Sequence, residues 1–515
     1  MFCCYNIRQF FQSRLQSSKK RQLTLNDKTA DLIAKFKLMF EPSSIVFPGA
    51  TNDPRKWGFR ILANIVNGGF KGRIYPVNPT KEEILGLKVY KSVSEVPETP
   101  DLAVIVIPPS GVPTVLRECA NKGIKIALVI TAGFAEVGLE GQKLQQEMVE
   151  IANSTGIRFM GPNSNGIVNP HHRFYPEMPP IFPRPGPFSI VSQSGNIVGT
   201  IMRLAIDSGF GCAKCVSSGN EANIHSHDYI RYLAEDPQTK VILSYIEGFK
   251  DGSRFFEVAK EVSKKKPIVM LKAGETPAGA IAAKSHTASL AGSYTLFDAM
   301  CKQSGIIKVT NLDELVDTGI ALLCHPLPKG RRVGIVTAGG GWGVLAADAC
   351  ARLGLDVVSL PPETISELDS FMPAWWNRGN PVDLVAGIFG DAVMRCVEVI
   401  LRCPIVDGVI FLGLMPALPL EQFALAAKED DRERLREVLV SGIAGIFGKL
   451  HELSDKYKKP IVVASEPMAF AANLTRKIVR TLADMNSVCY DMPHKAATAF
   501  ANLAKYGEYL KQNSS

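Results

Sequence analysis

The sequence contains no run of 18 or more apolar residues, so it predicts no membrane-spanning helix. It also lacks three familiar catalytic motifs: the phosphate loop GxxxxGKS/T, the zinc-binding pair HExxH and the GxSxG nucleophile turn. No basic run with interleaved aromatic residues occurs, so nucleic acid is not an expected partner. The first expected strand-to-helix turn, Pro48–Lys56, lacks GxGxxG and a following ribose-binding acid, which disfavours a nicotinamide-dependent dehydrogenase.

A disulfide framework is also missing, because the 11 cysteines are scattered, and this fits a reducing compartment. Cys212 and Cys215 match CxxC, but no second pair stands at metal-site spacing and the pair falls in an expected strand. His225 and His227 should diverge on an expected helix, where solvated histidines are the simpler interpretation. The sequence therefore predicts no metal site.

Composition describes a soluble globular chain of 515 residues, 46% hydrophobic and 21% charged, with about three domains. The net charge of +8 is mild and would favour small polyanionic ligands such as nucleotides. The first 26 residues carry five basic residues and no acid. That composition resembles an organellar transit peptide, while a disordered tail or an extended gene start explains it equally well. We expect a cytoplasmic protein, with the mitochondrial matrix as the alternative.

Apolar strand-like runs alternate with helix-length amphipathic segments, which predicts parallel α/β sheets. We expect a basic tail over 1–26 and three doubly wound domains over 27–170, 188–326 and 330–510, with a proline-rich linker, Pro176–Pro187, after the first. In such sheets, ligands bind at the carboxyl ends of the strands. The expected strands cover 44–47, 73–77, 102–107, 125–130, 188–191, 241–246, 267–271, 332–337, 408–412 and 460–464.

His286 is the most informative single residue. It lies in a glycine- and alanine-rich segment, Ala273–Gly292, and a loop of about 20 residues is uncommon unless it is functional or disordered. Small side chains let the backbone approach a ligand and let the loop move. Imidazole is a competent nucleophile near neutral pH. The loop therefore suggests a carrier of a chemical group, with an ordinary surface histidine as the alternative.

Two strand-to-helix turns could bind anions, namely Ser192–Asn196 and Thr337–Gly343. Backbone N–H groups at a helix start, together with the helix dipole, favour negative charge there. Turn geometry alone also explains the glycines. Glu247 ends an expected strand, where a carboxylate could orient His286, and an acid that faces water is the alternative.

Taken together, these residues resemble the α subunit of the NDP-forming acyl-CoA synthetases, the acetate–CoA ligase (ADP-forming) group related to succinyl-CoA synthetase. The resemblance runs from about residue 27 to 505. The chain departs from the family at Ala338 and Trp342, where Asn and Pro are usual, and at Thr287-Ala288, where Thr-Gly is common. The motifs that carry the resemblance are Ser44–Ala50, Tyr75–Pro79, Gly161–Gly166, Ser192–Gly195, Ser218–Glu221, Tyr245–Gly248, Ser285–Thr287 and Asn380–Leu384.

The resemblance implies a Rossmann-like CoA-binding domain followed by two flavodoxin-like ligase domains. It makes His286 the phosphorylated residue and Glu247 the residue that steadies it. The phosphate or acyl phosphate would bind at Ser192, Ser194, Gly195, Asn163, Gly339, Gly340 and Gly341. Coenzyme A would contact Gly49, Ala50, Asn52, Lys56, Asn78, Pro79, Lys81, Pro108, Pro109, Ile130, Thr131 and Ala132.

The expected function is an ADP-forming acyl-CoA ligase subunit that uses coenzyme A, ATP or ADP with Mg²⁺, and a small carboxylic acid. Because no ATP-grasp region follows Asp383, we expect the nucleotide to bind mainly on a separate ATP-grasp β subunit in a hetero-oligomer. One alternative is a CoA-binding regulatory protein without catalytic activity. Another is a hydrolase of acyl phosphates or acyl-CoA.

Overall fold

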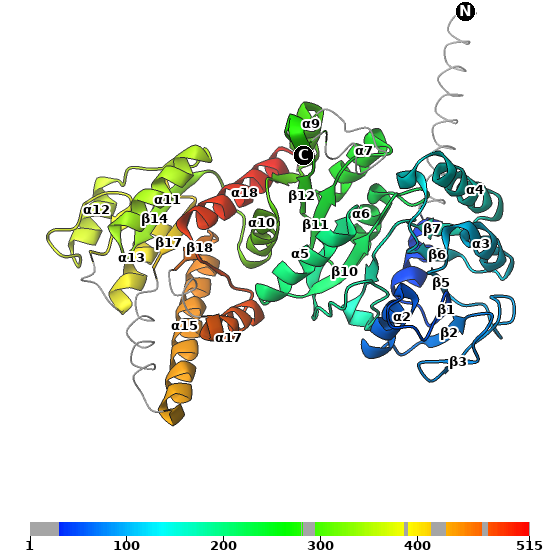
Figure 1. Ribbon diagram of the computed structural model, residues 1–515. Coiled ribbons are helices and arrows are strands. Elements are labelled where there is room, and N and C mark those ends of the chain that lie inside the picture. The colour runs from blue at the N-terminus through cyan, green and yellow to red at the C-terminus, as the bar shows by residue number, and fades with distance from the viewer. Residues whose placement is uncertain are drawn as a thin grey trace, which may run out of the picture. The chain divides into compact units, whose positions relative to one another are not determined.

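The structure of the protein, a computed structural model, describes residues 30–279, 281, 294–385, 390–413, 429–465 and 472–513 (Figure 1). It divides into two compact units, Met1–Phe182 with Val216–Tyr232 and Pro183–Cys215 with Leu233–Ser515. No helix in these described ranges has the length and apolar character needed to cross a bilayer. The prediction of parallel α/β sheets is confirmed.

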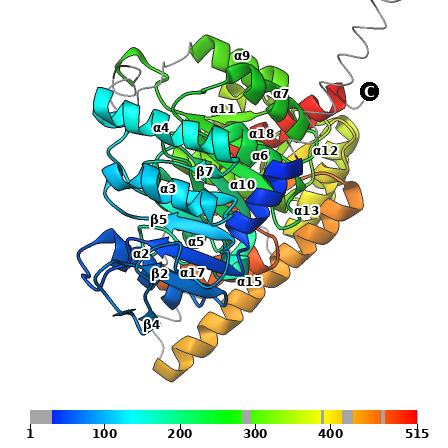
Figure 2. The same ribbon diagram turned by 90° about the vertical axis from the view of Figure 1, so that its right-hand side faces the viewer.

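The first unit is built on a five-stranded parallel sheet with the order β2-β1-β5-β6-β7. Strands β1 and β5 are buried at every position, as expected of central strands covered on both faces. Helices α3 and α4 pack side by side on this unit (Figures 1 and 2). The elements are β1 (Ser44–Pro48), α2 (Trp57–Asn67), β2 (Arg73–Val77), β3 (Glu83–Ile84), β4 (Leu87–Lys88), β5 (Leu102–Ile105), α3 (Val112–Asn121), β6 (Ile126–Val129), α4 (Leu139–Thr155), β7 (Arg158–Met160) and β8 (Gly166–Val168).

The second unit begins with a sheet in which the strands follow the order β13-β12-β11-β9-β10. The expected proline-rich linker runs into this sheet, because β9 begins at Pro185, and proline is tolerated at the start of a strand. The end of β10 from Val216 and α6 up to Tyr232 belong to the first unit. The elements along this part of the chain are β9 (Pro185–Ser192), α5 (Gly195–Asp207), β10 (Cys212–Ser217), α6 (Ser226–Glu235), β11 (Val241–Ile246), α7 (Gly252–Val262), β12 (Ile268–Lys272), α9 (Tyr294–Ser304), β13 (Ile307–Val309) and α10 (Leu312–Cys324).

A further parallel sheet in the second unit has the order β15-β14-β17-β18-β19, and β16 also pairs with β14. Its strands are mostly apolar and fully buried, as in β17 and β18. The elements are β14 (Arg332–Thr337), α11 (Gly340–Arg352), β15 (Asp356–Val357), α12 (Pro362–Asp369), β16 (Val382–Asp383), α13 (Asp391–Arg402), β17 (Gly408–Leu412), α15 (Glu429–Tyr457), β18 (Ile461–Ala464), α17 (Ala472–Asp484), β19 (Cys489–Tyr490) and α18 (Pro493–Gln512).

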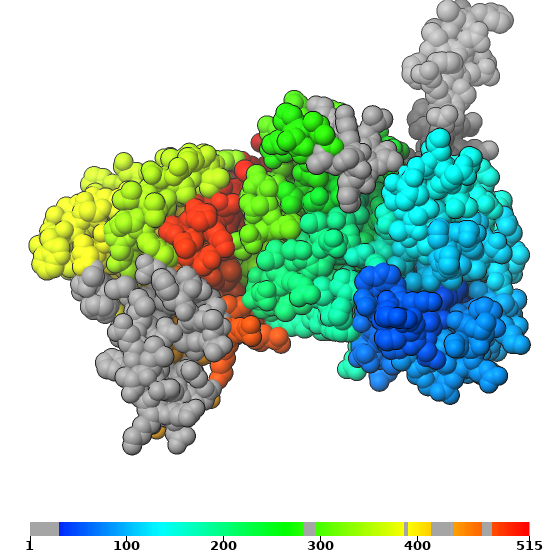
Figure 3. Space-filling view, in the orientation of Figure 1, coloured from blue at the N-terminus to red at the C-terminus, as the bar shows by residue number. Residues whose placement is uncertain are grey.

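Helix α18 joins the two sheets of the second unit. It packs on α10, which lies on β11 and β12, and on α11, which lies on β14. Its surface is visible in red beside these helices in Figure 3. The Asn502 amide donates to the Thr318 hydroxyl at 2.9 Å, and the Tyr506 hydroxyl donates to the Ser263 carbonyl at 2.8 Å. These contacts explain why two sheets form a single compact unit.

The segment Val216–Tyr232 belongs to the first unit although its neighbours in the chain belong to the second. The Asn223 side chain accepts a hydrogen bond from the Phe159 N–H at 3.1 Å, and the Asn223 carbonyl accepts one from Arg158 at 2.7 Å. The ring of Tyr229 lies 5.2 Å from that of Phe36. Polar and aromatic contacts therefore hold this segment on the first unit.

Candidate functional site

In each of the three large sheets the strand order reverses next to the first strand. The chain runs from β1 to β2 on one side and then to β5 on the other, and the same reversal occurs at β9 with β11 and at β14 with β17. Loops that leave the carboxyl ends of such a strand pair diverge, and the crevice between them is where open α/β sheets bind ligands. Each sheet therefore has one such crevice at a predictable position.

In the first unit, the residues predicted to bind CoA gather at this crevice. Gly49 follows β1 with a φ of 101°, and a Cβ added there would lie 2.0 Å from the carbonyl oxygen of Val106, which follows β5. Only glycine allows this close approach of the two loops. The Asn78 amide, after β2, donates to the Ala50 carbonyl at 2.8 Å and so ties the next loop to the same edge.

The remaining CoA candidates lie on the same edge. The amide of Asn52 donates to the Glu83 carbonyl at 3.1 Å, and Lys56, the N-cap of α2, and Lys81 are both exposed. The hydroxyl of Thr131, after β6, donates to the Ile107 carbonyl at 2.7 Å. Exposed cations beside the amino end of a helix suit a polyanionic ligand. The other candidates, Pro79, Pro108, Pro109, Ile130 and Ala132, stand in the same loops after β2, β5 and β6.

Asn163 connects two loops of the first unit. Its backbone N–H donates to the Thr131 carbonyl at 2.8 Å, and its side-chain amide donates to the Asn220 side chain at 3.2 Å. Asn220 in turn donates to the Glu136 carboxylate at 2.6 Å. Burial raises the pKa of Glu136, but the hydrogen bonds from Asn220 and from the Gly133 N–H outweigh it, so that the net pKa is lowered. No local pattern marks Glu136, because its partner Asn220 lies 84 residues away in the chain.

In the second unit, the turn after β9 places Ser192 and Ser194 at the start of α5. The Ser192 hydroxyl donates to the Ser194 carbonyl at 2.7 Å and accepts from the Ser194 N–H at 3.2 Å, which folds the turn back on itself. Ser194 is the N-cap of α5, and its hydroxyl makes no capping hydrogen bond. The first N–H groups of α5, beginning with Gly195, therefore point to a position where an anion could bind.

Gln193 links this turn to Glu247. Its side-chain oxygen accepts from the backbone N–H groups of Glu247 at 2.7 Å and of Gly248 at 3.0 Å, and its side-chain nitrogen donates to the Gly248 carbonyl at 2.8 Å. Glu247 follows β11 and is 7% exposed. Lys272, whose pKa is lowered by burial, stands opposite Ile246 on the neighbouring strand β12. The sequence singles out Glu247 but neither Gln193 nor Lys272.

The turn after β14 repeats the turn after β9. The Thr337 hydroxyl donates to the Gly339 carbonyl at 2.7 Å and accepts from the Gly339 N–H at 3.3 Å. Gly339 is the N-cap of α11, and Gly340 and Gly341 form its first turn. A Cβ added to Gly340 would lie 2.8 Å from the Asp383 carboxylate. The two turns therefore share one hydrogen-bond pattern, and a carboxylate stands beside the second turn.

Comparisons with known proteins match all three parts of the chain. Family matches cover residues 43–170 (CoA binding domain), 185–322 (succinyl-CoA ligase like flavodoxin domain) and 333–437 (Ligase-CoA domain). The chain is 41% identical over 441 residues to the acetate–CoA ligase [ADP-forming] II subunit alpha of Pyrococcus furiosus, covering 84% of this chain and 95% of that protein. The chain belongs to the ADP-forming acyl-CoA synthetases.

Other relatives of this acyl-CoA synthetase chain support the same family. A 4-hydroxybutyrate–CoA ligase [ADP-forming] of Nitrosopumilus maritimus is 34% identical over 479 residues, which cover 92% of this chain and 65% of that protein. The solved dinucleotide forming acetyl-coenzyme A synthetase 1 of Ca. Korarchaeum cryptofilum, in complex with phosphate and ADP, has a TM-score of 0.78 at 32% identity, covering 93% of this chain and 99% of that one. The predicted family, fold class and ligase class are therefore confirmed.

Three histidines of this acyl-CoA synthetase chain, His225, His227 and His286, figure in the predictions from sequence. His286 and its neighbours from 282 to 293 lie outside the described residues. His225 and His227 do not diverge as expected, because α6 begins at Ser226 and His225 precedes it. Their rings stack instead, with centroids 5.4 Å apart.

Proposed function

We propose that this chain is the α subunit of a two-chain enzyme that joins a small carboxylic acid to coenzyme A while ATP is converted to ADP and phosphate, or runs the reverse reaction. The observation that carries the proposal is the connection made by Gln193 between the turn Ser192–Gly195 and Glu247 at the β9–β11 crevice. It brings helix N–H groups and one nearly buried carboxylate to the same sheet edge, as phosphoryl transfer through a histidine requires.

The proposed chemistry has three steps. The His286 imidazole attacks the γ-phosphorus of ATP, the bond to the β-phosphate oxygen breaks and ADP leaves. A carboxylate oxygen of the acid then attacks the phosphohistidine, which frees the imidazole and forms an acyl phosphate. Finally the thiol of coenzyme A loses its proton and attacks the acyl carbon, and inorganic phosphate leaves. Positioning and electrostatic stabilisation supply most of the catalysis in such transfers.

The residues would have three roles: orienting His286, binding the phosphate or acyl phosphate, and binding CoA. Glu247 would accept a hydrogen bond from one ring nitrogen of His286, which leaves the other nitrogen to carry the phosphoryl group. The N–H groups at the start of α5 and the Ser194 hydroxyl would bind the phosphate or acyl phosphate, with Ser192 shaping the turn. Asn163 and the glycine turn Gly339–Gly341 would bind phosphate as further contacts. CoA would bind at the β1–β5 crevice, against Gly49, Ala50, Asn52, Lys56, Asn78, Pro79, Lys81, Pro108, Pro109, Ile130, Thr131 and Ala132.

The nucleotide and its Mg²⁺ would bind mainly on a separate ATP-grasp β subunit. The name of the Pyrococcus furiosus relative, a subunit alpha, supports a partner chain in this family. The acid substrate would be small. Acetate and 4-hydroxybutyrate, which appear in the names of two relatives, are the first acids to test. We also propose a cytoplasmic enzyme, with the mitochondrial matrix as the alternative. The nine cysteines for which the structure gives a state are buried thiols, which fits a reducing compartment.

The test is transfer of phosphate from ATP labelled at the γ position, in the purified two-chain complex. We expect acid-labile label on the α chain that disappears when a carboxylic acid and coenzyme A are added, and no label on His286→Ala. A matched control is His494→Ala, which removes an exposed imidazole and should label normally. Retention of label on His286→Ala would refute the proposed carrier.

The same complex separates the ligase from the rival regulatory function. Two relatives that match this chain over most of their own length are named as ADP-forming ligases, and these names favour a ligase. A ligase forms acyl-CoA and ADP in equal amounts from at least one acid of an acetate, 4-hydroxybutyrate and aromatic acid panel. Binding of CoA without any acyl-CoA formation across the panel would instead support a regulatory protein.

A further inference from the structure

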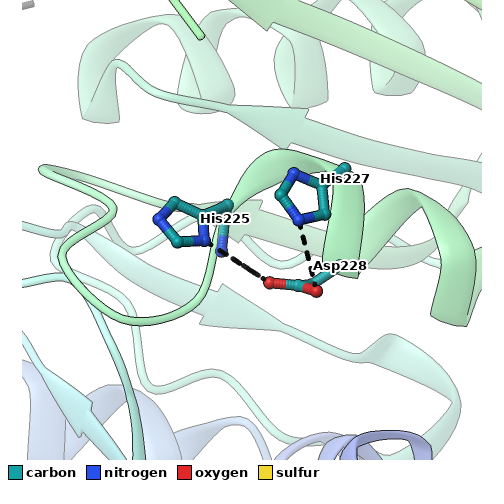
Figure 4. A group of neighbouring side chains, drawn as sticks. All are labelled: His225, His227 and Asp228. Atoms are coloured by element: carbon teal, nitrogen blue, oxygen red, sulfur yellow. Dashed lines mark hydrogen bonds and ion pairs between the residues drawn. The ribbon is translucent and has the colours of Figure 1, made fainter. Parts of the chain in front are cut away.

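A cluster of two imidazoles and one carboxylate stands at the start of α6 in the first unit, and none of its three residues has a role in the function proposed above. It consists of His225, the residue before the helix, and of His227 and Asp228 in the first turn (Figure 4). One donor atom from each of the three side chains lies within 4.8 Å of the other two. Figure 4 shows the His227 ring pointing toward the Asp228 carboxylate.

The distances within this cluster suit a shared ion better than direct hydrogen bonds. The Nδ1 atom of His225 lies 3.7 Å from one carboxylate oxygen of Asp228, and the Nε2 atom of His227 lies 3.6 Å from the other. Both separations exceed the usual hydrogen-bond length of about 2.7–3.2 Å. Two ligands held about 2.0–2.2 Å from one metal ion in a tetrahedral arrangement are separated by about 3.4 Å. Small side-chain rotations would therefore complete such a site.

The carboxylate is already fixed as a ligand would be. The backbone N–H of His225 donates to Asp228 Oδ2 at 3.0 Å, and the backbone N–H of Asp228 donates to the His225 carbonyl at 2.9 Å. Such additional hydrogen bonds orient the ligands of metal sites. The side chains are 29%, 12% and 18% exposed for His225, His227 and Asp228, so the cluster is largely shielded and only partly exposed to water.

We propose that His225, His227 and Asp228 bind one divalent transition-metal ion of the zinc class. Two imidazole nitrogens and one carboxylate oxygen suit Zn²⁺, Co²⁺ or Ni²⁺, whereas Mg²⁺ and Ca²⁺ favour sites made of oxygen atoms. Water would complete the coordination. This inference goes beyond the ligase reaction and does not depend on it.

The ion would fix the end of a loop that carries a family motif. Ser226, between the two histidines, donates to the Glu221 carboxylate, which also accepts from the Ser218 hydroxyl at 2.7 Å. His225 ends this loop, and Asp228 belongs to the helix that follows. An ion bound to both would join the loop to the helix and should raise the melting temperature of the protein, since a ligand that binds only the folded state stabilises it.

The test uses the full-length chain without a histidine tag, stripped of metal and titrated with Co²⁺ and with Zn²⁺. We expect one equivalent of Co²⁺ to give visible absorption bands of a site with nitrogen and oxygen ligands, without the near-ultraviolet band of thiolate ligation. That band distinguishes this site from binding to cysteines. Zn²⁺ should displace Co²⁺ and raise the melting temperature.

Variants decide whether the cluster is the site. Asp228→Asn keeps an oxygen that can accept the His225 N–H, so the helix start should stay folded, while His227→Ala removes one ring. Each should weaken Zn²⁺ binding by more than about tenfold, because even outer-shell substitutions cost metal sites about 10–100-fold. His494→Ala, at an exposed position on α18, should bind like the wild type. Wild-type affinity in both Asp228→Asn and His227→Ala, or no binding by the wild-type chain, would overturn the proposal.

Discussion

Gln193→Ala is the most informative single substitution, because it removes the connection between the Ser192–Gly195 turn and Glu247 without touching a proposed reacting group. Three side-chain hydrogen bonds are lost, at 2.7, 2.8 and 3.0 Å. Each is worth about 0.5–1.5 kcal/mol. Gln193 is only half-buried, so water replaces part of the loss, and we expect the free energy of unfolding to fall by about 2 kcal/mol.

The effect on activity should exceed what this loss of stability explains. The backbone N–H groups of Glu247 and Gly248 both donate to one oxygen of Gln193, and the loss of these two bonds frees the end of β11 to shift. A misplacement of about 1 Å at a catalytic group costs about a hundredfold in rate. We therefore expect Gln193→Ala to slow phosphorylation of the chain by about that factor, with little change in the KM for coenzyme A.

The assay is single-turnover labelling from γ-labelled ATP in the two-chain complex, alongside urea denaturation of the α chain. Thr200→Ala is a matched control: its hydroxyl donates to the Asn196 carbonyl at 3.1 Å on the exposed face of the same helix, and its loss should change stability by less than about 0.5 kcal/mol. A Gln193→Ala chain that is destabilised yet phosphorylated at the wild-type rate would refute the positioning argument.

Three further substitutions test the surrounding structure. Gly49→Ala puts a Cβ 2.0 Å from a carbonyl oxygen at positive φ and should abolish CoA binding measured by calorimetry, whereas Gly86→Ala, also at positive φ but with nothing within 4 Å, should bind normally. Lys214→Met removes the ammonium group that lies 2.8 Å from the 4%-exposed Asp236 carboxylate. We expect the free energy of unfolding, measured by urea denaturation, to fall by about 3–5 kcal/mol, and a fall below about 1 kcal/mol would contradict this. Burial raises the pKa of Asp317 from 3.8 to about 6, so its contribution to stability is present below about pH 4 and is lost as the pH rises through 6. Asp317→Asn should therefore be more stable than the wild type near pH 7, by about 2 kcal/mol, and not near pH 4.

The strands were predictable because buried parallel strands are continuous apolar runs that end at proline or glycine. Val241–Ile246, Arg332–Thr337 and Gly408–Leu412 form residue for residue where the apolar runs predict them. Local composition therefore determines these elements, and the order in which they occur leads to the doubly wound arrangement.

The site was predictable only where a signal lies within a few residues. The turn at Ser192 and the acid Glu247 are each visible in the sequence, but Gln193 meets Glu247 across 54 residues, and nothing local marks that pair. His225 and His227 were expected to diverge because both were assigned to one helix, and a helix start that falls between them reverses that conclusion. Contacts between distant segments depend on the register and order of strands, which a single sequence does not specify.

Helix α18 has a consequence for how the protein assembles during synthesis. Residues 493–512 leave the ribosome after every strand of the three large sheets, yet they make the bonds that hold the last two sheets together. Domains otherwise tend to fold one after another as they emerge. The apolar faces of α10 and α11 that α18 covers therefore stay exposed until α18 has been synthesised. Substitutions that slow the docking of α18 should increase aggregation of newly made chains more than they lower the stability of folded ones.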